Sequence, residues 1–99
     1  MNVTVKDRMV ALESEDVDPS SVEVTTMRVN GRWMVAARDT RDRVELMSDG
    51  DSFAQAMMEM MAYADERVKT SDAGRLAAHL RIAEAVRRHQ FVIGLDPRD

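Results

Sequence analysis

The feature that most constrains the fold of this chain is the dipeptide Asn30-Gly31, which lies between two segments of alternating polar and apolar residues. Asparagine and glycine both accept positive φ, so the pair favours the type I′ turn whose twist suits a two-stranded hairpin. The flanking segments are rich in valine and threonine, which favour strands. A two-residue turn also fixes the register, so we expect Val29 to pair with Arg32 and the earlier residues to follow in step.

Two of the pairs that this register creates are favourable contacts. Glu23 comes to lie opposite Arg38, so the two side chains carry complementary charges. Arg28 comes to lie beside Trp33, where its guanidinium can make a cation–π contact with the indole. Both contacts support the predicted pairing of the two strands.

A third strand is expected at residues 43–47, after a tight turn with Thr40 and Arg41 at its tip. Together the three strands make an antiparallel meander over residues 22–47. The pairs expected between the second and third strands are Ala37 with Val44, Val35 with Leu46, and Met34 with Met47.

The alternation of side chains gives this meander two different faces. One face is apolar and forms the predicted core, with the residues Val22, Val24, Thr26, Trp33, Val35, Ala37, Val44 and Leu46. The other face carries one methionine from each strand in a single row: Met27, Met34 and Met47. Charged residues surround this row, among them Glu23, Arg32, Arg38, Arg43 and Glu45.

Two helices are predicted after the sheet, within residues 52–90. Ser52, followed three residues later by Gln55, fits a capping box and predicts a helix from about Phe53 to Val68. Its apolar residues cover a wider arc than one sheet can bury. The segment 70–72 ends this helix, and a second helix is expected from about Ala73 to Gln90.

The two ends of the chain are less regular. Residues 1–21 are expected to form an N-terminal helix from about Thr4 to Glu13, followed by an acidic loop, although residues 3–5 also fit the start of a strand. In the tail 91–99, the apolar residues 91–93 are expected to form a short strand or latch. The whole chain, residues 1–99, is therefore predicted to be one α+β domain: a three-stranded antiparallel meander with an N-terminal helix and two C-terminal helices.

Composition excludes several kinds of chemistry. The chain has no cysteine, which rules out disulfides, thiolate metal sites and cysteine nucleophiles. Its two histidines, His79 and His89, lie about 15 Å apart along one helix, too far to share a metal ion. No apolar run reaches the ~20 residues of a membrane span. Charged residues at 6–8 stand where a secretory signal needs apolar ones, so we expect a cytoplasmic protein with no membrane partner.

Motifs for catalysis or cofactor binding are also missing from the sequence. No serine lies in a nucleophile-elbow pattern, and the four glycines form no phosphate-binding motif. The segment Asp49-Gly50-Asp51 resembles the opening of a calcium loop, but Phe53 stands where that loop needs an oxygen ligand. We therefore expect a protein that is not an enzyme and that holds no cofactor or metal ion.

The abundance of methionine has two interpretations. The chain has nine methionines, and four of them lie close together in the helix predicted at residues 53–68. They fill gaps in a core if the second helix covers them, or they form an adaptable surface for a partner. We expect contact residues on the outer sheet face at Met27, Met34, Met47, Arg32, Arg38 and Arg43. A second candidate surface lies on the helix, at Met58, Met61 and Ala62. The expected partners are a second copy of the chain and another protein.

Some arrangements of these elements resemble known families. The expected order of helices and strands over residues 4–68 resembles the double-stranded-RNA-binding domain, but the lysines that begin the final helix in that family are replaced here by Asp49, Asp51, Ser52 and Gln55. Residues 22–68 resemble the antitoxins of the HicB type, in their tryptophan-bearing strand and Gly-Asp-Ser helix start. The small acidic α/β secretion chaperones offer a further likeness.

We therefore expect a non-catalytic regulatory module that acts by binding another protein, like an antitoxin, a modulator encoded by a phage or mobile element, or a chaperone. The alternative is a regulator that binds nucleic acid through the last helix, where Arg81 and Arg88 share a face. The net charge of −4 makes this alternative the less favoured one.

Overall fold

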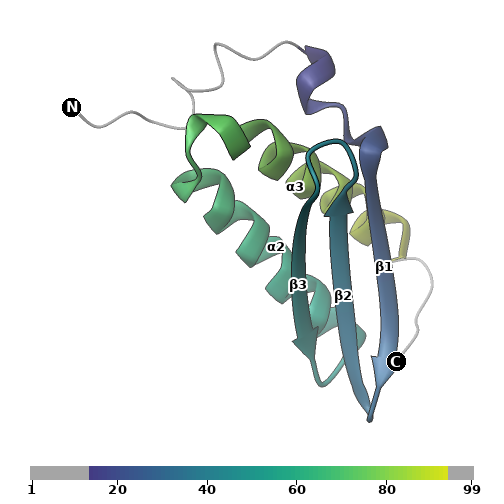
Figure 1. Cartoon of the computed structure of the whole chain (residues 1–99). Helices are drawn as coiled ribbons and strands as arrows, with labels where there is room; N and C mark the ends of the chain where they lie inside the picture. The colour runs from purple at the N-terminus through teal and green to yellow at the C-terminus, as the bar shows by residue number, and fades with distance from the viewer. Residues whose placement is uncertain (1–13, 94–99) are drawn as a thin grey trace.

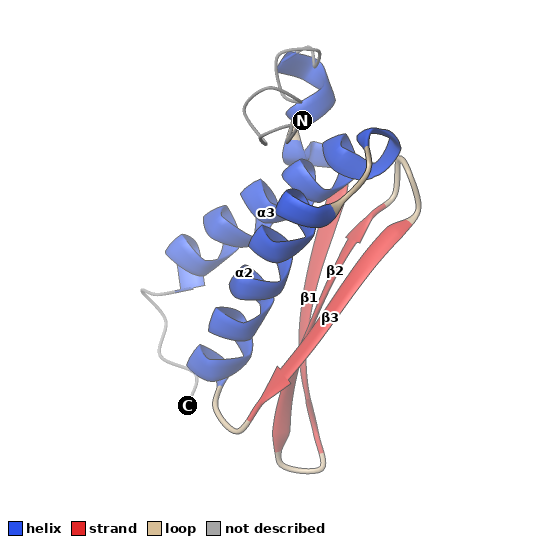
Figure 2. Cartoon of the chain, turned by 90° about the vertical axis from the view of Figure 1, so that its left-hand side faces the viewer, coloured by secondary structure: helices blue, strands red, loops and turns tan. Residues whose placement is uncertain are grey.

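The computed structural model of the chain describes residues 14–93. Three consecutive strands form one antiparallel sheet in the order β1-β2-β3, and two long helices follow it. Both helices lie on the same side of the sheet (Figures 1 and 2). The α+β class is therefore confirmed, whereas the helix expected at residues 4–13 lies outside the described residues. The elements are η1 (Ser14–Val17), η2 (Pro19–Ser21), β1 (Val22–Val29), β2 (Arg32–Asp39), β3 (Val44–Gly50), α2 (Phe53–Thr70) and α3 (Ala73–Ile93).

The β1–β2 hairpin has the predicted register throughout, with Val29 opposite Arg32 at the turn. Asn30 and Gly31 have φ of 52° and 80°, the two positive values that a type I′ turn needs. The guanidinium of Arg28 lies 5.7 Å from the centroid of the Trp33 ring, so the expected cation–π contact is present. Local turn chemistry was sufficient to predict this half of the sheet.

The β2–β3 pairing differs from the prediction by two residues. Ala37 pairs with Leu46 rather than Val44, and Val44 pairs with Asp39. The connection is a four-residue loop over 40–43 instead of a two-residue turn. The Asp39 carboxylate accepts a hydrogen bond from the Asp42 N–H at 3.1 Å, which holds this wider loop. A shift of two residues leaves every side chain on its predicted face, because side chains alternate with a period of two.

The third strand is longer than predicted, because Ser48 and Gly50 join the sheet instead of breaking it. The Ser48 hydroxyl donates a hydrogen bond to the Ala56 carbonyl in α2 at 2.8 Å. Gly50 allows close packing, since a Cβ there would lie 2.6 Å from the Ala56 nitrogen. Ser52 caps α2 as predicted, because its hydroxyl accepts from the Gln55 N–H. The returning bond of a capping box differs: the Gln55 side chain accepts from the Asp51 N–H, one residue before the N-cap.

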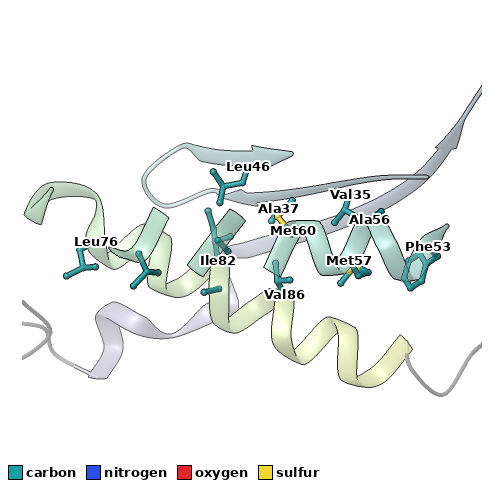
Figure 3. Close-up of a cluster of buried hydrophobic side chains, with 13 residues drawn as sticks. Val35, Ala37, Leu46, Phe53, Ala56, Met57, Met60, Leu76, Ile82 and Val86 are labelled. Atoms are coloured by element: carbon teal, nitrogen blue, oxygen red, sulfur yellow. The ribbon is translucent and has the colours of Figure 1, made fainter. Parts of the chain in front are cut away.

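The core fills the space between the sheet and the two helices (Figure 3). The sheet contributes its inner face, including Val35 and Leu46, and α2 contributes Met57 and Met60. The Trp33 ring packs edge-on against Phe53, with 5.3 Å between the ring centroids. From α3 the core takes the side chains of Leu76, Ile82, Ala83 and Val86. The second helix therefore covers part of the methionine-rich helix, as the gap-filling interpretation requires.

Two segments that were not predicted to be helical are helical in the structure. α3 continues through residues 91–93, so the expected strand or latch is wrong. Residues 91–93 contain no glycine or proline, and the first such residue after them is Gly94, which explains the extra turn. The acidic segment before the sheet forms the short helices η1 and η2, with the Asp18 side chain capping the latter by accepting from the Ser20 N–H. This hydrogen bond lowers the pKa of Asp18.

Candidate partner-binding face

The sheet has one covered face and one open face within residues 14–93. α2 and α3 both pack on the inner face, and Figure 2 shows the sheet as the outer layer on its other side. The core that both helices share with the sheet takes its strand residues from the inner face. The outer face therefore presents side chains from all three strands to solvent.

An apolar strip crosses the middle of this outer face. Met27 is 48% exposed and Met47 is 50% exposed, values far above those of the core methionines. Met34 is half-buried between them, pairing with Met27 directly and lying diagonally from Met47. Ala36 stands directly opposite Met47. We call these four residues, Met27, Met34, Ala36 and Met47, the methionine strip.

Charged residues of both signs flank the methionine strip. On one side, Arg38 stands between Glu23 and Glu45 in the strand pairing. On the other side, the Arg32 guanidinium donates to the carboxylates of Asp49, at 3.4 Å, and Asp51. These ion pairs are exposed and therefore contribute little to stability. An apolar centre with a charged rim is typical of protein contact surfaces.

One predicted contact residue lies elsewhere. Arg43 was expected on the outer face beside the methionines, but it belongs to the β2–β3 loop and has a φ of 57°. It lines a pocket next to α2 and α3, together with Arg67, Arg75 and His79. The prediction failed because it took Arg43 as the first residue of the third strand, whereas the strand begins at Val44.

The second candidate surface, on α2, is smaller than predicted. Met58 is 65% exposed, and Ala62, one turn later, is exposed too. Met61 is only half-exposed, because it packs against the core. This leaves a single prominent methionine on the outer side of α2 rather than an apolar surface.

The arginines proposed for nucleic-acid binding are both engaged within the chain. Arg81 is 1% exposed, and its guanidinium donates two hydrogen bonds to the Asp39 carboxylate, at 3.2 and 2.7 Å. It also donates to Asp42 and, at 2.6 Å, to the Asp16 carbonyl. Arg88 is exposed and bonds Glu84 one turn earlier. Arg81 is thus a structural residue in this fold, and the predicted two-arginine patch does not form.

The Asp39–Arg81 pair is the buried ionic centre of the molecule. Burial would raise the pKa of Asp39, but hydrogen bonds from Arg81, Ser21 and the Asp42 N–H together lower it below its usual value. The same hydrogen bond from Arg81 to Asp39 raises the pKa of Arg81. This centre ties η1, the β2–β3 loop and α3 to the sheet.

Sequence reasoning missed several residues of the open face. Ala36 and Val29 point outward beside the methionines, and Val29 is 40% exposed. Their spacing of two residues from Met34 and Met27 is the signal that identifies them. Asp49 was missed as a partner of Arg32 because the third strand was expected to end before it.

The described part of the chain shows no sign of two other kinds of site. Nowhere in residues 14–93 do three or more histidine or carboxylate side chains gather as metal ligands would. Across the same residues, neither helix has the length and apolar character needed to cross a membrane.

No family model, curated protein or solved structure matches this chain.

Proposed function

We propose that the chain is a non-catalytic protein-contact module that associates with a second copy of itself through the outer face of its sheet. The exposure of Met27 and Met47 on a face that no described element covers carries this proposal. Methionine side chains are flexible and polarizable, so they adapt to an apposed surface at little steric cost. Covering the methionine strip removes apolar surface from water, which favours association.

The charges around the methionine strip do not oppose pairing of two copies. Arg32 is already compensated by Asp49 and Asp51 of its own chain. Arg38 lies between two glutamates in the strand pairing. Because the rim of each copy carries both positive and negative charges, repulsion between like charges does not dominate when two outer faces meet.

The size of the face sets the expected strength of the contact. Strands of eight residues and three strands side by side give a footprint of roughly 26 by 14 Å, or about 370 Å². Two such faces bury less than the ~1,200–2,000 Å² of a standard stable interface. The proposed homodimer is therefore reversible, with dissociation in the micromolar range or weaker.

The test is sedimentation equilibrium of the full chain over a concentration series, comparing the wild type with Met34→Asp. A carboxylate at the centre of the strip should weaken self-association at least about tenfold. Met58→Asp, on α2, is the matched control, because it places the same charge on an exposed methionine outside the strip. A thermal unfolding curve for each variant verifies that it is folded.

Three results would count against the proposal. The wild type could be monomeric at hundreds of micromolar. Met34→Asp could associate as strongly as the wild type, or Met58→Asp could weaken association in its place. The last result would move the contact to α2.

A further inference from the structure

A pocket of about 400 Å³ lies on the helix side of the sheet, away from the methionine strip. It occurs where the β2–β3 loop and the start of β3 meet the end of α2 and the start of α3, all at one end of the molecule (Figures 1 and 2). Its volume lies within the ~300–1,000 Å³ range of small-molecule sites. Its charged and polar lining residues are Asp42, Arg43, Glu45, Arg67, Arg75 and His79.

The three arginines of this pocket differ from most others in the described part of the chain. Arg32, Arg41, Arg81, Arg87 and Arg88 each form an ion pair with a carboxylate. Within residues 14–93, Arg43, Arg67 and Arg75 have no such partner; Arg67 lies over the Tyr63 ring, 5.7 Å from its centroid. The guanidinium groups of these three arginines are therefore not held in ion pairs within the described residues.

The carboxylates at the pocket offset only part of the charge of these arginines. Asp42 is already engaged with the guanidinium of Arg81. Glu45 stands opposite Arg38 in the sheet pairing. Arg81 already has the charge of Asp39 against it, so Asp42 and Glu45 both count against the three arginines of the pocket. The excess is about one positive charge, which favours an anion.

A buried histidine completes the pocket. His79 is 4% exposed, and its Nδ1 atom has no hydrogen-bond partner in the structure. A buried polar atom without a partner is uncommon in folded proteins. Burial lowers the pKa of His79, and the positive charges of Arg67 and Arg75 lower it further. Both of these arginines line the same pocket as the imidazole.

We infer that this pocket binds a phosphate-class dianion, either free or as the phosphomonoester of a small molecule. Guanidinium groups present paired N–H donors that fit the oxygens of such an anion, and unpaired arginines need give up no internal ion pair to bind it. The pocket is larger than one phosphate group, so it has room for an attached organic portion. The pocket shares only Glu45 with the rim of the methionine strip and contains none of the strip's four residues, so the two proposals can be tested separately.

Binding should change the protonation of His79. A bound dianion offsets the charges of Arg67 and Arg75, which now lower the pKa of His79, so that pKa should rise. The other charged groups around the imidazole are Asp72 at the start of α3, and Asp42, Arg43 and Glu45 from the loop and β3. Sulfate keeps its double charge between pH 8 and pH 6. Because protonated His79 favours the bound anion, the affinity for sulfate should increase as the pH falls across this range.

The experiment is an NMR titration of the full chain with inorganic phosphate, sulfate and glycerol 3-phosphate, each at constant ionic strength set with sodium chloride. We expect saturable shifts of the amides of Gly74 and Arg75 and a rise in the pKa of His79, with His89 as the internal reference. Tighter binding of glycerol 3-phosphate than of phosphate would identify a phosphomonoester as the ligand; equal binding would identify the free anion.

Matched variants separate a built site from general attraction to positive charge. Arg75→Gln should weaken sulfate binding at least about tenfold, and Arg88→Gln, on the same helix but outside the pocket, should leave it unchanged. The inference is overturned if shifts grow linearly without saturation, or if Arg88→Gln weakens binding as much as Arg75→Gln. It is also overturned if the pKa of His79 stays fixed while the anion binds.

Discussion

Two pairs of methionines in this chain have opposite surroundings. Met57 and Met60 on α2 are 1% and 0% exposed, whereas Met27 and Met47 on the sheet are 48% and 50% exposed. In the sequence, helical periodicity places Met57 and Met60 in an apolar stripe, and strand alternation places Met27 and Met47 in another. The difference arises because two helices cover the inner face of the sheet and none of the described elements covers the outer one. A methionine-rich sequence therefore contributes both a core and a candidate contact surface.

The largest expected effect contrasts two aspartates on the same sheet. Asp39 points inward and is fully buried against Arg81, whereas Asp49 points outward and bonds the exposed Arg32. Asp39→Ala leaves the buried guanidinium without its main partner and should cost about 3–5 kcal/mol in the free energy of unfolding. Asp49→Ala should change it by less than about 0.5 kcal/mol. Urea unfolding of both variants measures the contrast, and equal losses would contradict it.

The second contrast uses the methionines themselves. Met60→Ala opens a cavity between the sheet and both helices and should lower the free energy of unfolding by about 2–4 kcal/mol. Met47→Ala removes a half-exposed side chain, so it should cost well under 1 kcal/mol at protein concentrations where the chain is monomeric. Chemical denaturation of dilute samples gives both values. A Met47→Ala variant as unstable as Met60→Ala would show that the outer face is covered within one chain.

A smaller effect is expected from pH on the inner side of the sheet. The pKa of His79 is lowered in the folded chain by burial and by Arg67 and Arg75. The unfolded chain therefore takes up a proton at a higher pH than the folded one, so stability falls as pH drops below about 6.5. His79→Gln should reduce this loss between pH 7.5 and pH 5.5 in thermal unfolding. If the variant loses as much stability between pH 7.5 and pH 5.5 as the wild type, groups other than His79 cause the loss.

The comparison of the two hairpins explains what sequence reasoning can predict here. The β1–β2 register follows from Asn30 and Gly31 alone, because the turn type is a local property. The β2–β3 loop depends on Asp39, whose carboxylate binds Arg81 from a helix 42 positions later in the chain. No local pattern reveals that partner. The sequence therefore predicted a loop that is two residues too short, and it placed Arg43 on the outer face of the sheet instead of in the loop.

The candidate site shows the same division between local and distant information. Alternation of side chains placed Met27, Met34 and Met47 on one face, and the register error of two residues did not move them off it. Burial of Arg81 was not predicted, because helical periodicity cannot distinguish an arginine that faces solvent from one that meets a buried aspartate. For the same reason the pocket at His79, which joins four separate segments, was not predicted.

Oxidation of methionines by hydrogen peroxide, mapped by mass spectrometry at low and high protein concentration, tests the central claim most directly. Exposed methionines oxidise faster than buried ones, so Met57 and Met60 should be slow throughout. If two copies pair through the outer face, oxidation of Met27 and Met47 should slow several-fold at high concentration while that of Met58 stays unchanged. Unchanged rates at Met27 and Met47, or protection of Met58 alone, would contradict the account.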